Sequence, residues 1–486
     1  MSDLNNKVAN ATKWSAFAEI IGKLVAPITT MVLARVLTPE AFGVVTTLTM
    51  IIAFAEIFTD AGFQRYIIQH EFEDEDDKDK SINVAFWSNL TMSILLWGLI
   101  AIFAEPLAAL VGNSGLGIVL IVACASIPLE AFSSIQMAVF RRSLDFKSLF
   151  YRRLVAVVIP LFITVPLAFW LRSYWALVFG TIAVNLSNAV ILTLQSPWRP
   201  RLYYSFARLK DMLSFSVWSM FDAILIWATS YIEIFFIGCM LSAYYLGIYK
   251  TSMTTVTQFT SVITSAILPV IMPALSRIQH DYAAMRQMLL KIQKYLGILL
   301  LPIGFGIFMF SQLITDILLG SQWQEAVPFI GIWGLMEAIT VVLQRICSNI
   351  FPAIGKPRIS VVVQILHLIV LIPAVYISIG YGFSALFYTR AFVRLEGVLV
   401  NIIFAYVIIR LSIKSIVVNL IPEFFACIIM CLVAALLLKA NHNIPFSILW
   451  VVISMCVYTG TLYLFPKERS IIKDLSSRML KHRITK

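Results

Sequence analysis

The stretch WSAFAEIIGKLVAPITTMVLARVLTPEAFGVV, residues 14–45, decides the fold because its main features return 204 positions later. Its opening WSAF (residues 14–17) returns as WSMF (residues 218–221). Its Leu-Thr turn followed by Gly43 returns as a Leu-Ser turn followed by Gly247. Several matches at one offset, each at the start or end of a long apolar segment, indicate a duplicated helical unit. The sequence therefore predicts two related halves.

The composition places both halves in a membrane. The 486 residues are 60% hydrophobic and 13% charged, whereas soluble domains carry about 25% charged residues. Apolar runs of about twenty residues recur along the chain, and each is long enough to cross a hydrocarbon core as a helix. Barrel strands would instead show runs of about ten residues with alternating polarity. We predict an all-α integral membrane protein.

The apolar runs and the glycines between them predict about fourteen transmembrane helices. The weakest separations are those at residues 112–117 and 380–382, where glycines interrupt continuous apolar sequence. The predicted spans are 14–36, 41–62, 82–104, 116–137, 154–171, 174–195, 212–238, 245–268, 295–318, 327–350, 359–379, 382–409, 416–438 and 446–465.

The repeat divides these helices into two lobes. Six spans separate the repeated segments, and because six is even, both halves enter the membrane from the same side. This is the parallel-repeat arrangement. We predict an N-terminal lobe (1–210, helices 1–6), a C-terminal lobe (211–410, helices 7–12), and two additional helices with a basic tail (411–486).

The distribution of basic residues predicts the orientation of the chain. With the N-terminus inside, the inner segments hold 29 of the 37 Lys and Arg residues, and the outer segments hold three. This bias predicts that both termini are cytoplasmic. The inner segment 273–294 has apolar residues near one face, which predicts either an amphipathic helix on the inner surface or a plain helical linker.

Five basic residues fall inside predicted spans, where each would cost about 2.5–3.5 kcal/mol at a lipid-facing helix centre. These residues are Lys23, Lys250, Arg345, Arg390 and Arg394. We expect them to face a cavity or a partner. Lys23 lies four residues from Glu19, so either an ion pair or a cavity position fits it. Arg345 lies two turns from Glu337 and near the end of its span, which favours a side chain reaching the membrane surface.

Lys250, Arg390 and Arg394 are the strongest candidates for an anion-binding site. Lys250 has no acidic residue three or four positions away, and its repeat equivalent is Thr46. Arg390 and Arg394 share one helix face, where two guanidinium groups repel each other unless an anion lies between them.

Acidic residues in or near the spans could couple transport to protons or sodium. The candidate coupling residues are Glu19, Glu56, Asp60, Asp222 and Glu233. We predict no metal site, because the five histidines are scattered and the six cysteines lie in or beside apolar segments. The chain also lacks a Gly-Lys-[Ser/Thr] phosphate loop, so we do not expect ATP to be the direct energy source. No enzymatic constellation is recognisable in the sequence, and we predict no catalytic site and no cofactor.

Six short motifs, taken together, resemble the polysaccharide-exporter (Wzx-type flippase) branch of the MOP superfamily, especially its colanic-acid-exporter-like members. These motifs are KWSA (13–16), VLAR (32–35) leading to Phe42-Gly43, DAGF (60–63) followed by IIQ (67–69), FRRSLDF (140–146), PALSRIQ (273–279), and Gly320 with Trp323. The resemblance covers nearly the whole chain.

The resemblance implies fourteen helices in two six-helix lobes plus two more, around a central cavity. It also implies a flippase that moves an undecaprenyl-pyrophosphate-linked oligosaccharide across the bacterial cytoplasmic membrane by alternating access. Expected partners are this lipid, membrane lipid and the polysaccharide polymerase or chain-length machinery, with no nucleic acid. Related lipid flippases carry cavity-facing cations on helices 1 and 8, which correspond by helix position to Lys23 and Lys250.

Two other functions are alternatives to this one. A cation-coupled multidrug exporter would share the architecture, but its cavity would favour carboxylates and aromatic residues. A membrane polymerase or ligase would need a substantial outer loop with catalytic polar residues, and the predicted outer loops are short.

Overall fold

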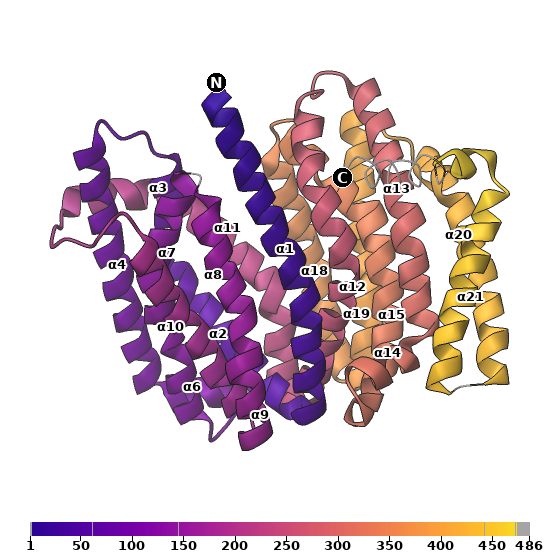
Figure 1. The fold of residues 1–486 in the computed structure, drawn as a ribbon, viewed down its shortest axis with the longest axis horizontal. Helices are drawn as coiled ribbons and strands as arrows, with labels where there is room; N and C mark the ends of the chain where they lie inside the picture. Colours follow the sequence, from indigo (N-terminus) through magenta and orange to yellow (C-terminus); the bar gives the residue numbers. More distant parts are fainter. Residues whose placement is uncertain (1, 61, 144, 442, 472, 474–486) are drawn as a thin grey trace. The chain divides into compact units, whose positions relative to one another are not determined.

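The computed structural model describes residues 2–60, 62–143, 145–441, 443–471 and 473. In this part of the chain all regular secondary structure is helical (Figure 1). Twelve helical segments are long and apolar enough to cross a bilayer, and a thirteenth is added if the bent pair Ala243–Ser265 and Val270–Ser276 is one span. The prediction of an all-α multi-pass membrane protein is confirmed.

Each predicted span from the second onward coincides with one of these helical segments. The predicted separations at glycines are also observed, since Gly112, Gly115 and Gly382 all have positive φ between helices. The first predicted span, 14–36, is helical within α1 (Ser2–Val36). Most side chains in its first half lie outside the described part of the structure, so the total of fourteen spans remains a prediction.

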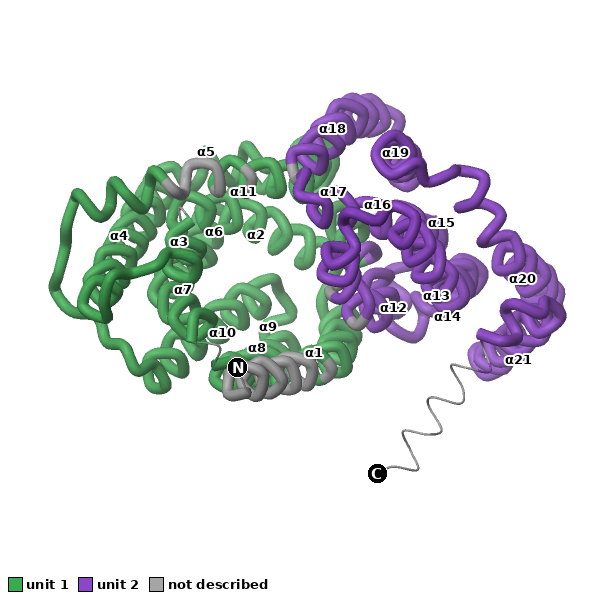
Figure 2. Tube along the Cα trace, turned by 90° about the horizontal axis from the view of Figure 1, so that it is seen from above, with its two compact units in different colours: residues 1–251 green, residues 252–486 purple. Residues whose placement is uncertain are grey.

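The chain forms two compact units, residues 1–251 and 252–486 (Figure 2). The division falls within α12 (Ala243–Ser276), whereas the predicted lobes divide at residue 210 and remain a prediction from the repeat. The other elements of the first unit, after α1, are α2 (Pro39–Asp60), α3 (Phe63–Gln69), α4 (Glu75–Ile102), α5 (Ala104–Leu110), α6 (Gly117–Cys124), α7 (Ser126–Arg142), α8 (Phe146–Ile159), η1 (Pro160–Thr164), α9 (Val165–Leu171), α10 (Trp175–Gln195) and α11 (Phe206–Met240).

The second unit begins with the remainder of α12. Its further elements are α13 (Tyr282–Met309), α14 (Ser311–Leu318), η2 (Ser321–Ala326), α15 (Val327–Thr340), η3 (Val341–Arg345), α16 (Ile346–Ser348), α17 (Ile350–Ala353), α18 (Pro357–Ile379), α19 (Phe383–Ile409), α20 (Ile413–Ala440) and α21 (Ile444–Tyr463).

The prediction of a surface helix at 273–294 is wrong. Residues 282–294 are the first turns of α13, and the helix continues without interruption into a membrane span. Met285 and Leu289 are buried in the core of the second unit, against residues such as Leu420 and Phe351. The apolar face seen in the sequence therefore packs against protein instead of lying on the bilayer.

The last two helices are fixed to α13 by buried polar contacts. The Lys294 ammonium lies 2.9 Å from Glu423 of α20 and also pairs with Glu468, which follows α21. The Tyr458 hydroxyl of α21 donates to the Ile298 carbonyl at 3.0 Å. Lys294 and both carboxylates are buried. The two helices without a repeat equivalent are therefore an integral part of the second unit.

The repeated segments meet at a close crossing of α2 and α12 in the first unit. A Cβ atom added at Gly43 would lie 1.8 Å from the Ala243 carbonyl oxygen, and one added at Gly247 would lie 1.8 Å from that of Pro39. Pro39 and Ala243 are also separated by 204 residues. The contact is reciprocal, as expected for two copies related by a local two-fold axis. Only glycine allows the two backbones this approach.

We expect Gly43→Ala to destabilise the protein by about 1–3 kcal/mol, because the new methyl group overlaps a backbone carbonyl that cannot move away cheaply. Gly98 in α4 is the matched control, since a Cβ there meets nothing within 4 Å. Gly98→Ala should be neutral or stabilising by up to about 1 kcal/mol. Thermal unfolding of the purified variants in detergent measures both, and equal midpoints would contradict the crossing.

Candidate substrate-binding site

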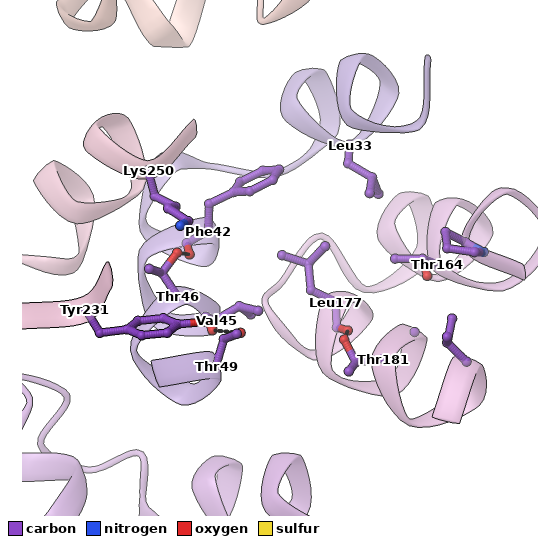
Figure 3. A pocket seen from close by; sticks show the side chains of 13 residues that line it. Leu33, Phe42, Val45, Thr46, Thr49, Thr164, Leu177, Thr181, Tyr231 and Lys250 are labelled. Carbon is purple, nitrogen blue, oxygen red and sulfur yellow. Dashed lines mark hydrogen bonds between the residues drawn. The ribbon is translucent and has the colours of Figure 1, made fainter. Parts of the chain in front are cut away.

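A cavity of about 370 Å³ lies inside the first unit, between α1, α2, η1, α10, α11 and α12 (Figure 3). Its lining is mainly apolar, with several threonine hydroxyls and one charged side chain, Lys250. The lining residues are Leu33, Phe42, Val45, Thr46, Thr49, Pro160, Thr164, Leu177, Gly180, Thr181, Val184, Tyr231 and Lys250. The prediction that Lys250 faces a cavity fits this position.

The glycine crossing explains why Lys250 reaches this cavity. Lys250 lies three residues after Gly247, and its repeat equivalent Thr46 lies three residues after Gly43. Both line the same cavity from facing helices. The Lys250 ammonium lies 6.0 Å from the centre of the Tyr231 ring, a cation–π contact. The charge of Glu233, which is buried on α11, also acts on Lys250.

The threonines of the cavity present oxygen atoms to its interior. Thr46, Thr49 and Thr181 each donate their hydroxyl proton to a backbone carbonyl of their own helix. Their lone pairs remain as acceptors for hydroxyl groups of a ligand. The cavity therefore combines one cation with several acceptors, and both suit a polar, anionic molecule.

A second cationic cluster lies in the second unit, around Glu337 of α15. Its carboxylate pairs with Arg394 of α19 and lies 2.9 Å from the Arg345 guanidinium. The guanidinium groups of Arg390 and Arg394 lie 5.5 Å and 4.3 Å from the Trp333 ring centre. The charges of Arg394, Arg345 and Arg390 all act on the Glu337 carboxylate.

The cluster also contains two hydrogen-bond donors that are unsatisfied within the described residues. The Nη1 atom of Arg394 and the indole Nε1 atom of Trp333 are buried and have no hydrogen-bond partner among the described residues. Such orphaned donors are costly unless a ligand or water fills the role of acceptor. The side chain of Arg345 is 41% exposed, so the cluster is reached from outside.

A π-turn places Arg345 beside Glu337. Eight residues of α-helix rotate a side chain by about 800°, roughly 80° past its starting face. The wider turn η3 holds one extra residue between the two positions and brings Arg345 back to the face of Glu337. Arg345 therefore pairs with Glu337, and its position at the membrane surface stays a prediction.

Glu19 and Lys23 form the ion pair that the sequence left open as one alternative. Their charged atoms are 3.5 Å apart, and Glu19 also binds Arg153 of α8 at 2.6 Å. Lys23 is not among the residues lining the cavity of Lys250. The sequence did not reveal Arg153, because the contact joins helices far apart in the chain.

The predicted coupling acids fall in different places. Glu56 and Asp60 lie together on α2, and the charge of Glu130 on α7 acts on Glu56. Glu130 in turn interacts with Arg152. The side chain of Asp222 lies outside the described residues. Within the described part of the chain, no three His, Cys, Asp or Glu side chains form a group able to hold a metal ion.

Glu396 does not join the arginine cluster, although it is close to both arginines in sequence. It pairs instead with His367 of α18 at 2.7 Å. Glu396 therefore points away from Arg394, and the His367 ring is hydrogen-bonded. Trp333, which contacts both arginines, gave no signal in the sequence, because an aromatic residue within a span is ordinary.

The fold and these groups define a multi-pass helical membrane protein with a lysine-bearing cavity and a buried arginine cluster. A family model described as polysaccharide biosynthesis protein matches residues 32–328. The chain therefore belongs to the polysaccharide biosynthesis protein family.

Two of the relatives with named roles are as follows. The succinoglycan biosynthesis transport protein ExoT of Rhizobium meliloti is 26% identical over 330 residues, which cover 67% of this chain and 64% of that protein. The lipopolysaccharide biosynthesis protein WzxC of Escherichia coli is 22% identical over 409 residues, covering 83% of this chain and 81% of the relative.

Solved structures show the same fold at low sequence identity. The lipid II flippase MurJ in an inward closed conformation matches with a TM-score of 0.75 and 12% identity, covering 94% of this chain and 99% of that one. An inward-facing multidrug resistance MATE transporter of the MOP superfamily matches with a TM-score of 0.63 and 14% identity, over 80% and 94%.

We expect Glu337→Gln to destabilise the protein by about 3–5 kcal/mol, because it removes the carboxylate that pairs with Arg394 and Arg345 and leaves the buried Arg394 guanidinium without this counter-charge. Glu396→Gln is the matched control, because Glu396 pairs with His367 alone and this pair is less buried. The loss of stability caused by Glu396→Gln should be clearly smaller. Thermal unfolding in detergent compares the two. A smaller effect at Glu337 than at Glu396 would contradict the role of Glu337 as the shared counter-ion.

Proposed function

We propose that this protein is a flippase that translocates an undecaprenyl-pyrophosphate-linked oligosaccharide across the bacterial cytoplasmic membrane by alternating access. The product would serve the synthesis of a surface polysaccharide such as O-antigen, capsule or exopolysaccharide. Membership of the polysaccharide biosynthesis family supports this proposal, as do relatives named for transport and for lipopolysaccharide synthesis. The observation that carries it is the Lys250 cavity, with its single cation and its threonine oxygens.

The proposed substrate has chemistry that matches these sites. A diphosphate joined to a glycan is anionic at one end and rich in hydroxyl groups at the other. Lys250 would replace part of the hydration of the phosphate, and Thr46, Thr49 and Thr181 would accept hydroxyl groups of the sugars. The polyprenyl tail would remain in the bilayer, since burial of its apolar surface in lipid costs nothing.

The arginine cluster provides a second anion site in this proposal. Arg394 and Trp333 each hold an unused N–H donor, and Arg345 is exposed enough for a phosphate to reach it. Arginine binds phosphate with two parallel hydrogen bonds. Arg390 adds positive charge to the same cluster.

Glu56 is our proposed residue for coupling to a proton or sodium ion. It lies in the first unit beside Asp60, and the charges of Asp60 and Glu130 both act on it. Carboxylates that crowd in this way take up a cation readily. Glu19 fits this role less well, because Lys23 and Arg153 already neutralise it.

The excess of Lys and Arg in the predicted inner segments supports a position in the cytoplasmic membrane with both termini in the cytoplasm. The protein would act as a transporter and leave chain assembly to a separate polymerase and its chain-length machinery. The alternative of a multidrug exporter is supported by the fold shared with the MATE transporter. A lysine in the cavity would repel cationic drugs, so this alternative fits the site less well.

Charge reversal by Lys250→Glu should reduce export of surface polysaccharide about tenfold or more, since it removes a charge-assisted contact of roughly 1.5–3 kcal/mol and adds repulsion. Complementation of a strain lacking the gene, scored by surface polysaccharide, measures this. Lys439→Glu, at an exposed lysine in the last turn of α20, is the matched control and should export normally. Normal export by Lys250→Glu, with normal insertion, would remove Lys250 from the mechanism.

Exchange of the residues at the two equivalent positions, 46 and 250, tests two alternatives. Export could require a cation on either helix of the cavity, or it could require the cation on α12 specifically. Thr46 and Lys250 line the same cavity, so Thr46→Lys combined with Lys250→Thr keeps one amine there. We expect this double variant to export more than Lys250→Thr alone in the same assay. If Thr46→Lys brings no gain, the position of the amine on α12 is what matters.

A further inference from the structure

An apolar pocket on the flank of the first unit has two arginines at one of its ends. The pocket has a volume of about 520 Å³ and lies between α4, α7 and α10. This volume falls within the roughly 300–1,000 Å³ typical of ligand sites. The pocket shares no lining residue with the Lys250 cavity. Its lining residues are Leu90, Pro128, Leu129, Phe132, Leu186, Ala189, Val190, Thr193 and Leu194.

The pocket opens along α10 toward the surroundings of the unit. Three of its lining residues, Leu186, Val190 and Leu194, are 51%, 49% and 72% exposed. Because Trp175–Gln195 is a candidate membrane span, we infer that these exposed apolar side chains face the bilayer. The opening of the pocket is therefore accessible to the hydrocarbon chains of membrane lipids.

The first arginine is held at the α10 wall. The Arg199 guanidinium donates to the carbonyl oxygen of Thr193, which itself lines the pocket. This carbonyl is one of the last in α10 and has no partner within the helix, so a cation is favoured there. Arg199 is otherwise exposed, four residues beyond the end of the span.

The second arginine is held at the α4 wall. The backbone N–H of Arg201 donates to Asn83 at 2.6 Å, and the indole of Trp87 donates to the Arg201 carbonyl at 2.8 Å. Leu90, which lines the pocket, is one turn beyond Trp87 on the same helix. The guanidinium of Arg199 is therefore held at the α10 wall and the backbone of Arg201 at the α4 wall, near the same end of the pocket.

The connection between α10 and α11 also carries apolar side chains that point outward. Leu202 is 94% exposed and Phe206 is 79% exposed, directly after the two arginines. Exposed apolar and basic residues side by side, just beyond the end of a span, are typical of the membrane interface. This places the two arginines at the depth of lipid phosphate groups.

We propose that this pocket binds one anionic glycerophospholipid, with an acyl chain in the apolar pocket and the phosphate between Arg199 and Arg201. An apolar cleft that opens to the bilayer is filled by the chain of the most abundant amphiphile there. The two cations at its interfacial end select for negative charge. The site is separate from the one proposed for the exported lipid and would anchor the connection between α10 and α11.

The test is native mass spectrometry of the purified full-length protein with added phosphatidylglycerol or phosphatidylcholine. Wild-type protein should retain phosphatidylglycerol in preference to phosphatidylcholine. Arg199→Gln combined with Arg201→Gln should weaken phosphatidylglycerol binding about thirtyfold, since each basic residue near an anionic lipid contributes about fivefold. Glutamine still donates to the Thr193 carbonyl, so the cap of α10 is preserved.

Two further variants make the result specific. Lys356→Gln with Arg358→Gln removes an exposed basic pair at the start of α18 and should leave retention unchanged. Val190→Trp fills the pocket from a half-exposed position and should lower retention without changing the thermal unfolding midpoint. Equal losses in both basic-pair variants, or full retention in the arginine or Val190→Trp variants, would overturn the proposal. Displacement of phosphatidylglycerol by lower concentrations of undecaprenyl phosphate would also overturn it, by assigning the pocket to the exported lipid.

Discussion

The cost of a charge in hydrocarbon is the constraint on which this structure depends. An unpaired ion inside a span costs several kcal/mol, so the chain must supply counter-charges from other helices. Glu337 forms ion pairs with Arg394 and Arg345, and Lys294 forms ion pairs with Glu423 and Glu468. Each group ties helices that are distant in sequence. Lys250 differs in its surroundings, because its ammonium lies over an aromatic ring at the edge of a cavity, and the charge of Glu233 acts on it.

The two copies of the repeat share the same backbone packing, but they differ in the side chain at one position that lines the cavity. Gly43 and Gly247 retain a reciprocal contact because any side chain there would overlap a backbone carbonyl. One turn further along each helix, the copies differ, with Thr46 in one and Lys250 in the other. A position that faces a cavity has no packing neighbour to satisfy, so it is free to change charge. The asymmetry between the two copies is what makes the cavity cationic.

The sequence predicts the helices well and their contacts poorly. Long apolar runs and the positive-φ glycines at 112 and 382 define spans and turns by local chemistry alone. The prediction of a surface helix at 273–294 is wrong because the sequence pattern of an apolar helix face is the same whether lipid or protein covers that face. The Glu19–Arg153 pair and the stacking of Arg394 on Trp333 were not foreseen, since both join helices whose neighbourhood is set by the tertiary fold. Helical periodicity predicts contacts only between residues three or four positions apart on the same helix.

A transporter must bind its cargo and then release it, and the arginine cluster bears on both steps. Guanidinium groups with no carboxylate beside them would hold a diphosphate too firmly to release it. Glu337 offsets part of their charge and fills the place of an anion when no substrate is present. Arriving phosphate would compete with this carboxylate for Arg394 and Arg345, and the carboxylate would return when phosphate leaves. The net affinity is then the difference of two strong interactions, which is how a site made of strong donors can remain reversible.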